Sequence, residues 1–205
     1  MARKKGTGIG KNYIPYISTA KLNSLGTTSV IKDWKTGRGV HCLSQGEAYW
    51  YYILRWDDNN IDIREQYPLE QSETTKIAME HGFRPAQNGT IMMTTDFLVT
   101  KADGTFHAYS VKADRDLSER TLQLLCVEKI YWNSRGVPHS LLFKTDVNRV
   151  LVDNIRRVVE FYDAESVFDL HSAIKHKIAT KEYGIDMTHH TLTTTDMERL
   201  LEIYE

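Results

Sequence analysis

The chain has 205 residues, 41% of them hydrophobic, which suits one domain with a real core plus a short appendage. Its two cysteines, Cys42 and Cys126, show neither metal-type spacing nor a disulfide framework, as is typical of a reduced compartment. No apolar run is long enough to span a bilayer, and the start of the chain lacks a signal-peptide pattern. We therefore expect a cytoplasmic protein, bacterial or phage-associated, with no membrane partner.

The net charge of −1 conceals an uneven distribution. Residues 1–40 contain eight Lys and Arg and one acid, whereas residues 41–205 contain 18 basic and 26 acidic residues. A basic arm on an acidic body is typical of a segment that contacts phosphates, but a solvated tail fits the charge pattern as well. The predicted DNA-binding residues of this arm are Lys11, Lys32, Lys35 and Arg38.

The N-terminal arm, residues 1–43, carries aromatic side chains around Tyr13 and a strand-like segment at 40–43. These aromatics stack on bases in some proteins, but more often they dock a tail on the core. A helix then opens after Ser44, because Ser at the cap with Glu47 three residues on makes a capping box. The helix is dense in Tyr and Trp, which predicts a buried helix that runs to about residue 57.

The rest of the body, residues 44–162, alternates between strand and helix patterns. The predicted elements are a strand at 61–67, a helix at 71–82, a loop at 84–89, a hairpin at 92–112, a helix capped by Asp116 and ending at Ser134, a strand at 139–145 and a helix at 148–161. Residues 163–205 are predicted to form a small acidic helical region, with helices at about 164–181 and 194–205. A sheet with helices packed on it indicates an α/β or α+β domain.

The hairpin is the most informative stretch. Its three-residue loop, residues 102–104, ends in Gly and suits a type I turn followed by a left-handed residue. In the register that this loop sets, Asp96 faces Ser110, and Lys112 shares the face of Ser110 because side chains alternate with period two. A two-residue turn would instead pair Asp96 with Val111 and move Lys112 to the other face.

These residues suit phosphodiester hydrolysis with magnesium, which needs hard oxygen ligands and benefits from a nearby cationic side chain. Asp96 supplies a carboxylate, Lys112 an ammonium, Val111 a backbone carbonyl and Glu47 a second carboxylate. Two simpler explanations exist. Asp and Lys across a hairpin are often a surface pair, and Glu47 is already explained by its capping box. The apolar residues around Asp96 favour the metal site, because a carboxylate near a buried sheet is costly without compensation.

At these residues the chain resembles the TnsA-like endonucleases of heteromeric cut-and-paste transposons, over about residues 8–160. The matching segments are Lys11-Asn12-Tyr13-Ile14-Pro15-Tyr16, Leu43-Ser44 with Glu47, Asp62 to Leu69, Thr95 to Val99, Val111-Lys112, and Glu119 to Leu122 running into Glu128 and Tyr131-Trp132. The resemblance implies an α/β fold with a restriction-endonuclease-like mixed sheet flanked by helices, followed by a small α-helical C-terminal region.

The resemblance also implies roles. Asp96 resembles the central metal-binding carboxylate, Glu47 the helix-borne acid and Lys112 the catalytic lysine. Glu128 matches a further acidic position, although here it is also a plain helix-surface residue. The expected cofactor is Mg²⁺, with Mn²⁺ as an alternative, as one or two ions. The chain departs from the family at Ser110. Two residues before the catalytic lysine, the family has Gln, and the wider group of restriction-type folds has Glu. Serine reaches a metal only through water, so the number of ions stays open.

In that family the endonuclease cuts the 5′ strands at transposon ends, while a DDE-type transposase cuts and joins the 3′ strands and an ATPase regulates the pair. The resemblance therefore implies a metal-dependent DNA endonuclease subunit of a transposase that acts on double-stranded DNA at transposon ends. Two alternatives stay open. One is a non-catalytic nuclease-like protein that binds DNA and the transposase, which Ser110 favours, and the other is a stand-alone restriction-like nuclease.

Overall fold

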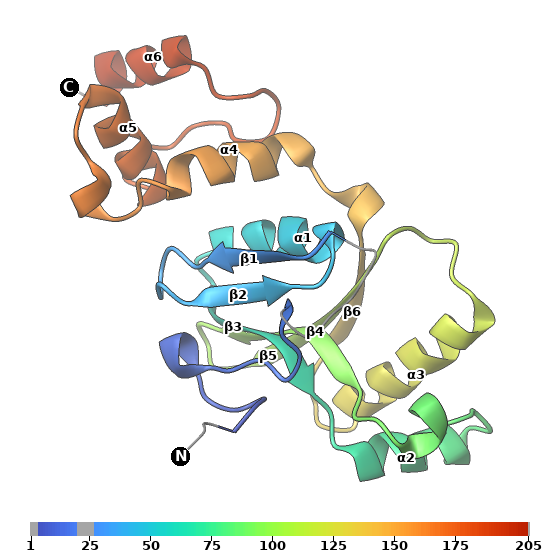
Figure 1. The fold of residues 1–205 in the computed structure, drawn as a ribbon. Coiled ribbons are helices and arrows are strands. Elements are labelled where there is room, and N and C mark those ends of the chain that lie inside the picture. Colours follow the sequence, from blue (N-terminus) through green and yellow to red (C-terminus); the bar gives the residue numbers. More distant parts are fainter. Residues whose placement is uncertain (1–3, 20–26, 205) are drawn as a thin grey trace.

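The computed structural model describes residues 4–19 and 27–204. Its main sheet has four strands in the order β3-β4-β5-β6 (Figure 1). The strands are β3 (Asn60–Pro68), β4 (Thr94–Lys101), β5 (Phe106–Lys112) and β6 (His139–Phe143). The first three pair antiparallel and β6 joins β5 in parallel. The predicted mixed sheet is therefore confirmed, and the strand predicted at 61–67 is its first member.

Helices cover both faces of this sheet. One face carries α1 (Gln45–Trp56) and a separate two-stranded ribbon, β1 (Ser29–Lys32) and β2 (Gly39–Cys42). The other carries α2 (Gln71–Glu80) and α3 (Glu119–Asn133), as Figure 1 shows. Tyr51 of α1 and Phe97 of β4 lie in the first core, whereas Leu98 and Trp132 of α3 lie in the second. Consecutive residues of β4 thus serve opposite cores, as the pleat of a strand requires.

The C-terminal helices form a further layer above α1 (Figure 1). They are α4 (Arg149–Val159), α5 (Leu170–Ala179) and α6 (Thr194–Tyr204). Ile155 and Val158 of α4 pack with Ile174 of α5, and Trp56 of α1 lies against the same cluster. The helix predicted at 164–181 is shorter than expected, because a 3₁₀ turn at Ala164–Ser166 precedes α5. The predicted division of the chain into an N-terminal arm, a core and a C-terminal region, with boundaries after residues 43 and 162, stays a prediction. In the described part of the chain, no helix has both the length and the apolar character needed to cross a membrane.

The hairpin has the predicted register. Phe97 lies opposite Tyr109, and the pairing continues in step to Thr100 opposite Phe106. The turn is closed by Lys101, whose N–H donates to the Thr105 carbonyl at 2.8 Å. Gly104 has φ +84°, the left-handed conformation that the three-residue turn requires. The two-residue alternative is therefore excluded, and regular pairing stops one residue before Asp96.

The predicted cap of α3 is wrong. The helix begins at Glu119, and the Ser118 side chain accepts a hydrogen bond from the N–H of Thr121. The amide of Asp116 instead donates to Asp114, in a turn before the helix. Both Asp and Ser are good caps, so the choice depends on where helical backbone angles begin, which the side-chain pattern alone does not fix.

The N-terminal arm docks on β3. Tyr13 is 2% exposed, and its hydroxyl donates to the backbone carbonyl of Glu65 at 2.9 Å. Gly10 donates its N–H to the carboxylate of Asp62 on the same strand. Tyr13 is therefore a docking residue, and the alternative of base stacking is excluded for a ring buried in this way.

Arg38 is an anchor between the ribbon and the sheet. Its two terminal nitrogens bind the two carboxylate oxygens of Glu65, at 2.6 and 2.7 Å. The carboxylate of Glu65 is fully buried and also accepts the N–H of His41. The prediction that Arg38 contacts DNA is thus corrected, because its guanidinium is engaged in a buried bidentate ion pair that a phosphate would have to break.

Removal of this anchor should cost stability. Arg38→Ala leaves the Glu65 carboxylate buried without a counter-charge, which typically lowers the free energy of unfolding by about 3–5 kcal/mol. The exposed Lys32→Ala in β1 is the matched control, with an expected change within about 0.5 kcal/mol. Urea unfolding followed by circular dichroism measures both. Equal losses in the two variants would contradict the anchoring role.

Candidate functional site

The candidate site begins with an irregular residue in β3, Gln66. Gln66 has φ +48°, an uncommon backbone conformation for a residue other than glycine. Its neighbours face opposite layers: Glu65 binds Arg38 on the ribbon side, whereas Tyr67 packs against Trp132 of α3 with ring centres 5.9 Å apart. In a regular strand these neighbours would share one face. The positive φ of Gln66 re-aims its side chain although the strand pairing keeps the same register at Glu65 and Tyr67.

The amide of Gln66 joins the two predicted carboxylates. Its Nε2 lies 3.2 Å from Oε2 of Glu47 and 3.3 Å from Oδ1 of Asp96. On its other side, Oε1 accepts a hydrogen bond from the Thr94 hydroxyl at 3.1 Å. Gln66 is only 2% exposed. The structure therefore brings Glu47 and Asp96 together from α1 and β4, as the site hypothesis requires.

The start of α1 fixes the position of Glu47. Ser44 caps the helix by accepting the N–H of Glu47, which confirms the predicted cap. The carboxylate turns back to accept the N–H of Leu43 at 2.8 Å and the Ser44 hydroxyl at 2.8 Å. The capping role and the site role are therefore compatible, because the bonds of the cap hold the carboxylate beside Asp96.

The far end of the hairpin fixes Asp96. The N–H of Val111 donates to Oδ2 of Asp96 at 2.6 Å, and the ammonium of Lys112 donates to the Val111 carbonyl at 3.2 Å. Asp96 therefore contacts the backbone beside Lys112 rather than the hydroxyl of Ser110. The simple picture of three side chains on one face is incomplete, because regular pairing ends before Asp96 is reached.

Ser110 belongs to a different network. Its hydroxyl lies 2.9 Å from Nε2 of His139, and that nitrogen lies 3.5 Å from the carboxylate of Glu128. The Thr95 hydroxyl donates to Glu128 and itself accepts from the indole N–H of Trp132 at 2.7 Å. Glu128 is only 5% exposed, so its interpretation as a plain helix-surface residue is wrong. It lies in a buried polar network next to the carboxylate pair.

The environment of the two carboxylates raises both pKa values. Burial, and then the neighbouring charge of Asp96, raise the pKa of Glu47 to about 7. Burial raises the pKa of Asp96 as well, while the Lys112 ammonium lowers it and the Glu128 carboxylate raises it again. A pair of carboxylates that repel one another in a poorly solvated place is stabilised by a cation between them.

The donor set fits a hard divalent cation. Two carboxylates and the carbonyl of Val111 offer oxygen atoms, which suit Mg²⁺ or Mn²⁺ better than softer metals. Across residues 4–19 and 27–204, no three or more His, Cys, Asp or Glu side chains are grouped so that they could hold a metal ion. A cation at Glu47 and Asp96 must therefore complete its shell with backbone, amide or water oxygens.

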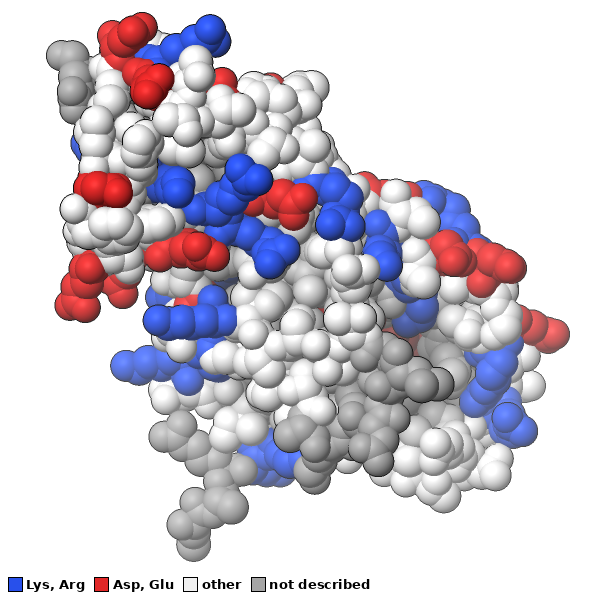
Figure 2. Space-filling view, turned by 45° about the horizontal axis from the view of Figure 1, so that its top comes forward, with Lys and Arg blue, Asp and Glu red and all other residues white. Residues whose placement is uncertain are grey.

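The predicted DNA-binding lysines lie away from the carboxylates. Lys11 and Lys32 are exposed, whereas the ammonium of Lys35 is 2.7 Å from the carboxylate of Asp58. Figure 2 shows Lys and Arg spread across the middle of the face that it presents, with Asp and Glu interleaved among them. The structure thus leaves Lys11 and Lys32 accessible to a phosphate, but it does not gather them at the site.

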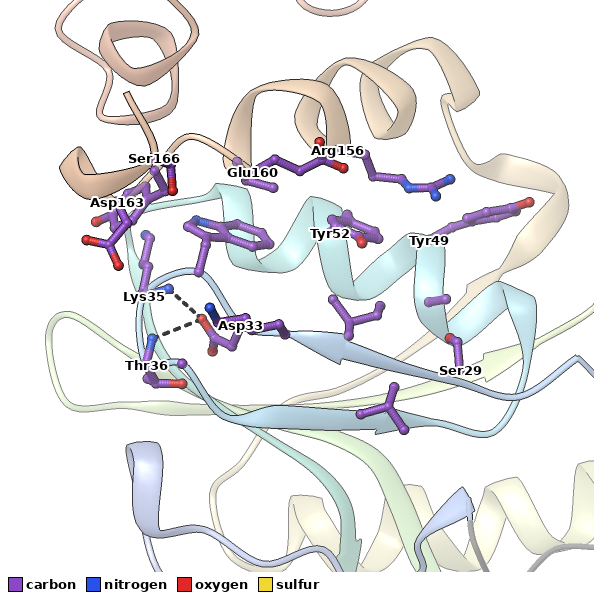
Figure 3. Close-up of a pocket in the computed structure, with 18 of the residues that line it drawn as sticks. Ser29, Asp33, Lys35, Thr36, Tyr49, Tyr52, Arg156, Glu160, Asp163 and Ser166 are labelled. Carbon is purple, nitrogen blue, oxygen red and sulfur yellow. Dashed lines mark hydrogen bonds between the residues drawn. The ribbon is translucent and has the colours of Figure 1, made fainter. Parts of the chain in front are cut away.

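A hollow of about 1020 Å³ lies on the outer side of α1 (Figure 3). Tyr49 and Tyr52 of α1, the β1–β2 ribbon and Arg156 of α4 line it, and Lys32 and Lys35 lie at its ribbon side. Its lining includes neither carboxylate of the pair nor Lys112. This hollow is therefore separate from the carboxylate pair, and the site is identified by its hydrogen bonds and charges instead.

Sequence analysis missed two residues of this region, Gln66 and His139. Gln66 lies within a segment that resembles the family, but strand alternation places it on the opposite face from Glu65, away from α1. His139 gave no signal beyond its place at the start of a predicted strand. Only the positive φ of Gln66 and the packing of β6 beside β5 bring the two side chains into the region.

The chain is similar to known proteins over this part of its length. The model of the family described as "TnsA-like endonuclease N terminal" matches residues 57–143, which include Asp96, Lys112 and Glu128. The chain is also 36% identical, over 156 residues, to "Transposon Tn7 transposition protein TnsA" of Escherichia coli. That match covers 74% of this chain and 57% of the relative, so the chain spans less than two thirds of it. Residues 57–143 therefore match the N-terminal domain of TnsA-like endonucleases.

Proposed function

We propose that this chain is a DNA endonuclease that depends on a divalent metal ion and hydrolyses phosphodiester bonds as a subunit of a transposase. The observation that carries the proposal is the Gln66 amide, which lies between the carboxylates of Glu47 and Asp96 within hydrogen-bond distance of both. Asp96 and Lys112 lie within residues 57–143, the part of the chain that matches the endonuclease family, and Glu47 lies just before it. A surface ion pair would not place two repelling carboxylates together in this way.

The cofactor that the donor set supports is Mg²⁺, with Mn²⁺ as a substitute, as one or two ions. Glu47, Asp96 and the Val111 carbonyl would hold it. When bound, such an ion neutralises the negative charge that develops on the phosphate and lowers the pKa of a bound water. The protein residues provide the orientation: the Val111 amide and the cap of α1 fix one carboxylate each.

Lys112 supplies the positive charge. Its ammonium donates to the Val111 carbonyl and interacts electrostatically with Asp96, which keeps it at the edge of the carboxylate pair. A cation in this position stabilises a phosphate whose charge grows as the bond to the leaving oxygen breaks. It also orients an attacking water by hydrogen bonding. Lys112 is therefore the proposed catalytic lysine, and Asp96 and Glu47 are the proposed catalytic carboxylates.

The partners follow from the relative, whose name places it in the transposition of Tn7. We extend this to double-stranded DNA at transposon ends, a DDE-type transposase subunit and a regulatory ATPase, with cleavage of the 5′ strands. Lys11 and Lys32, both exposed, are the proposed DNA contacts of the arm. A net charge of −1 provides little non-specific affinity for DNA, which favours delivery of the DNA by partners.

One observation favours a second candidate. The hydroxyl of Ser110 is bonded to His139, so the position where the family carries an amide offers no direct ligand. A protein that keeps the fold but binds DNA and the transposase without cutting would tolerate this change. A stand-alone nuclease is a third candidate, and it differs from the others because it would cut without any partner.

The three candidates differ in a strand-cleavage assay. Asp96→Asn keeps the size of the side chain but removes its charge. We expect 5′-strand cleavage to fall by at least about 100-fold, because loss of a residue that merely orients a metal ligand already costs about 10–100-fold. The assay supplies the transposase partner, DNA that carries transposon ends, and Mg²⁺ or Mn²⁺, and maps 5′ breaks on denaturing gels.

Asp103→Asn, in the exposed turn of the same hairpin, is the matched control and should cut like the wild type. Undiminished cutting by Asp96→Asn would refute the proposed site. No cutting by the wild type under these conditions would favour the non-catalytic candidate, and cutting without the transposase would favour the stand-alone nuclease.

The raised pKa of Glu47 predicts an unusual pH dependence of stability. With the folded pKa at about 7 against an ordinary value of 4.5, the folded state keeps a proton that the unfolded state has lost. Stability should therefore fall as pH rises from about 5 to 8 in EDTA, by up to about 3 kcal/mol from this group.

Urea unfolding at pH 5, 6, 7 and 8 measures this dependence. Glu47→Gln, which cannot ionise, should flatten it, and the exposed Glu80→Gln should not. Addition of Mg²⁺ at pH 8 should restore the stability of the wild type but not of Glu47→Gln. An unchanged pH slope in Glu47→Gln would show that this carboxyl does not titrate in the way that its environment implies.

A further inference from the structure

The carboxylate pair lacks an obvious third side-chain ligand. Glu47 and Asp96 provide carboxylates, and the next candidate along β5, Ser110, has its hydroxyl bonded to His139 on the other side of the sheet. Among the described residues no third His, Cys, Asp or Glu completes a metal-binding group. Magnesium-type ions prefer six oxygen ligands, so the site has room for a neutral oxygen donor.

The Gln66 side chain lies within hydrogen-bond distance of both carboxylates. Its Nε2 atom lies within 3.3 Å of a carboxylate oxygen of Glu47 and of Asp96, and the residue is 2% exposed. Its backbone is held at φ +48°, which costs free energy in a residue with a side chain. The neighbouring bonds maintain this conformation: the N–H of Tyr16 donates to the Gln66 carbonyl at 3.2 Å. A strained backbone at a buried polar residue beside two carboxylates indicates that the direction of the Gln66 side chain has a functional reason.

The surroundings of the Gln66 amide allow it two orientations, related by exchange of its oxygen and nitrogen. A hydroxyl both donates and accepts, so Thr94 can bond either end of the Gln66 amide. When ionised, the carboxylates of Glu47 and Asp96 only accept, so without a cation the nitrogen faces them. A cation between the carboxylates reverses this preference, because it attracts the amide oxygen and repels the N–H dipoles.

We propose that Gln66 is a metal ligand of this site through its Oε1 atom. When a divalent cation occupies the carboxylate pair, the amide turns end for end, Oε1 faces the cation and Nε2 donates to the Thr94 hydroxyl. Gln66 thereby provides from β3 the neutral amide oxygen that Ser110 does not provide from β5. This inference rests on the proposed metal-dependent function and adds a ligand to it.

Direct binding of Mn²⁺, measured by isothermal titration calorimetry with the metal alone, tests the ligand role without any cleavage assay. Gln66→Met is unbranched and similar in length but offers only a soft thioether, so Mn²⁺ affinity should fall by about tenfold or more. Gln66→Glu presents an oxygen and no N–H, so it should bind Mn²⁺ at least as tightly as the wild type does.

The opposite pattern would overturn the ligand role. If the amide served only as an N–H donor between the carboxylates, Gln66→Glu would place a third negative charge there and lose the bridge, and without metal it would be the less stable variant. Loss of Mn²⁺ affinity in both Gln66→Met and Gln66→Glu would therefore assign the residue a donor role alone. Unchanged affinity in Gln66→Met would also overturn the proposal.

Two controls separate this inference from the function on which it rests. Asp96→Asn should abolish Mn²⁺ binding, whereas Gln123→Leu on α3, remote from the pair, should bind as the wild type does. Mn²⁺ binding that Asp96→Asn loses and Gln66→Met keeps would overturn the role of Gln66 and leave the metal site intact. Absence of Mn²⁺ binding in the wild type would overturn both.

A further variant covers the case in which Gln66→Met does not fold. Thr94→Val keeps Gln66 and the shape of residue 94, but removes the hydroxyl that must accept from Nε2 when the oxygen faces the metal. We expect Mn²⁺ affinity to fall severalfold in Thr94→Val with little change in thermal stability. Affinity equal to that of the wild type would show that the amide does not turn.

Discussion

Repulsion between the carboxylates of Glu47 and Asp96 is the constraint on which the centre of this molecule depends. Each acid comes from a different element, and burial makes the charge of each expensive. The surroundings offset this cost with hydrogen-bond donors: the Leu43 amide and Ser44 hydroxyl for one, the Val111 amide for the other. The Gln66 amide is shared by both. These donors restrain the carboxylates without neutralising them, and the Lys112 ammonium offsets part of the charge of Asp96.

The irregular residue of β3, Gln66, connects this site to the architecture. On one side of Gln66, Glu65 faces the ribbon and holds Arg38 in a buried ion pair, and on the other side Tyr67 faces α3. The N-terminal arm covers the same point, since Tyr13 bonds the carbonyl of Glu65. One irregular residue thus directs three consecutive side chains to the ribbon, the site and the second core. The contacts of both neighbours therefore hold the backbone conformation that aims Gln66.

Sequence patterns predicted the parts of the site that local chemistry controls. The length of the turn after Lys101 fixed the register of the hairpin, and the cap at Ser44 placed Glu47 at the start of a helix, because both depend on a few adjacent residues. Gln66 escaped prediction because strand alternation is the default, and only tertiary contacts reverse it. Arg38 was misjudged for a related reason: the charge of the arm is visible in the sequence, but the buried carboxylate that neutralises one of its members lies on a strand 27 residues away.

The two faces of the sheet divide the acidic groups between them. Glu128 lies on the α3 side, where Thr95 and His139 contact its carboxylate and Ser110 completes the chain of polar contacts. From there it acts on Asp96 through its electric field, which raises the pKa of that carboxyl, rather than by direct contact. A serine at position 110 is short enough to bond His139 and stay within this network, whereas a longer amide would have to leave it to approach the carboxylate pair. Because His139 holds the Ser110 hydroxyl, the neutral side chain that faces both carboxylates comes from β3 and not from β5.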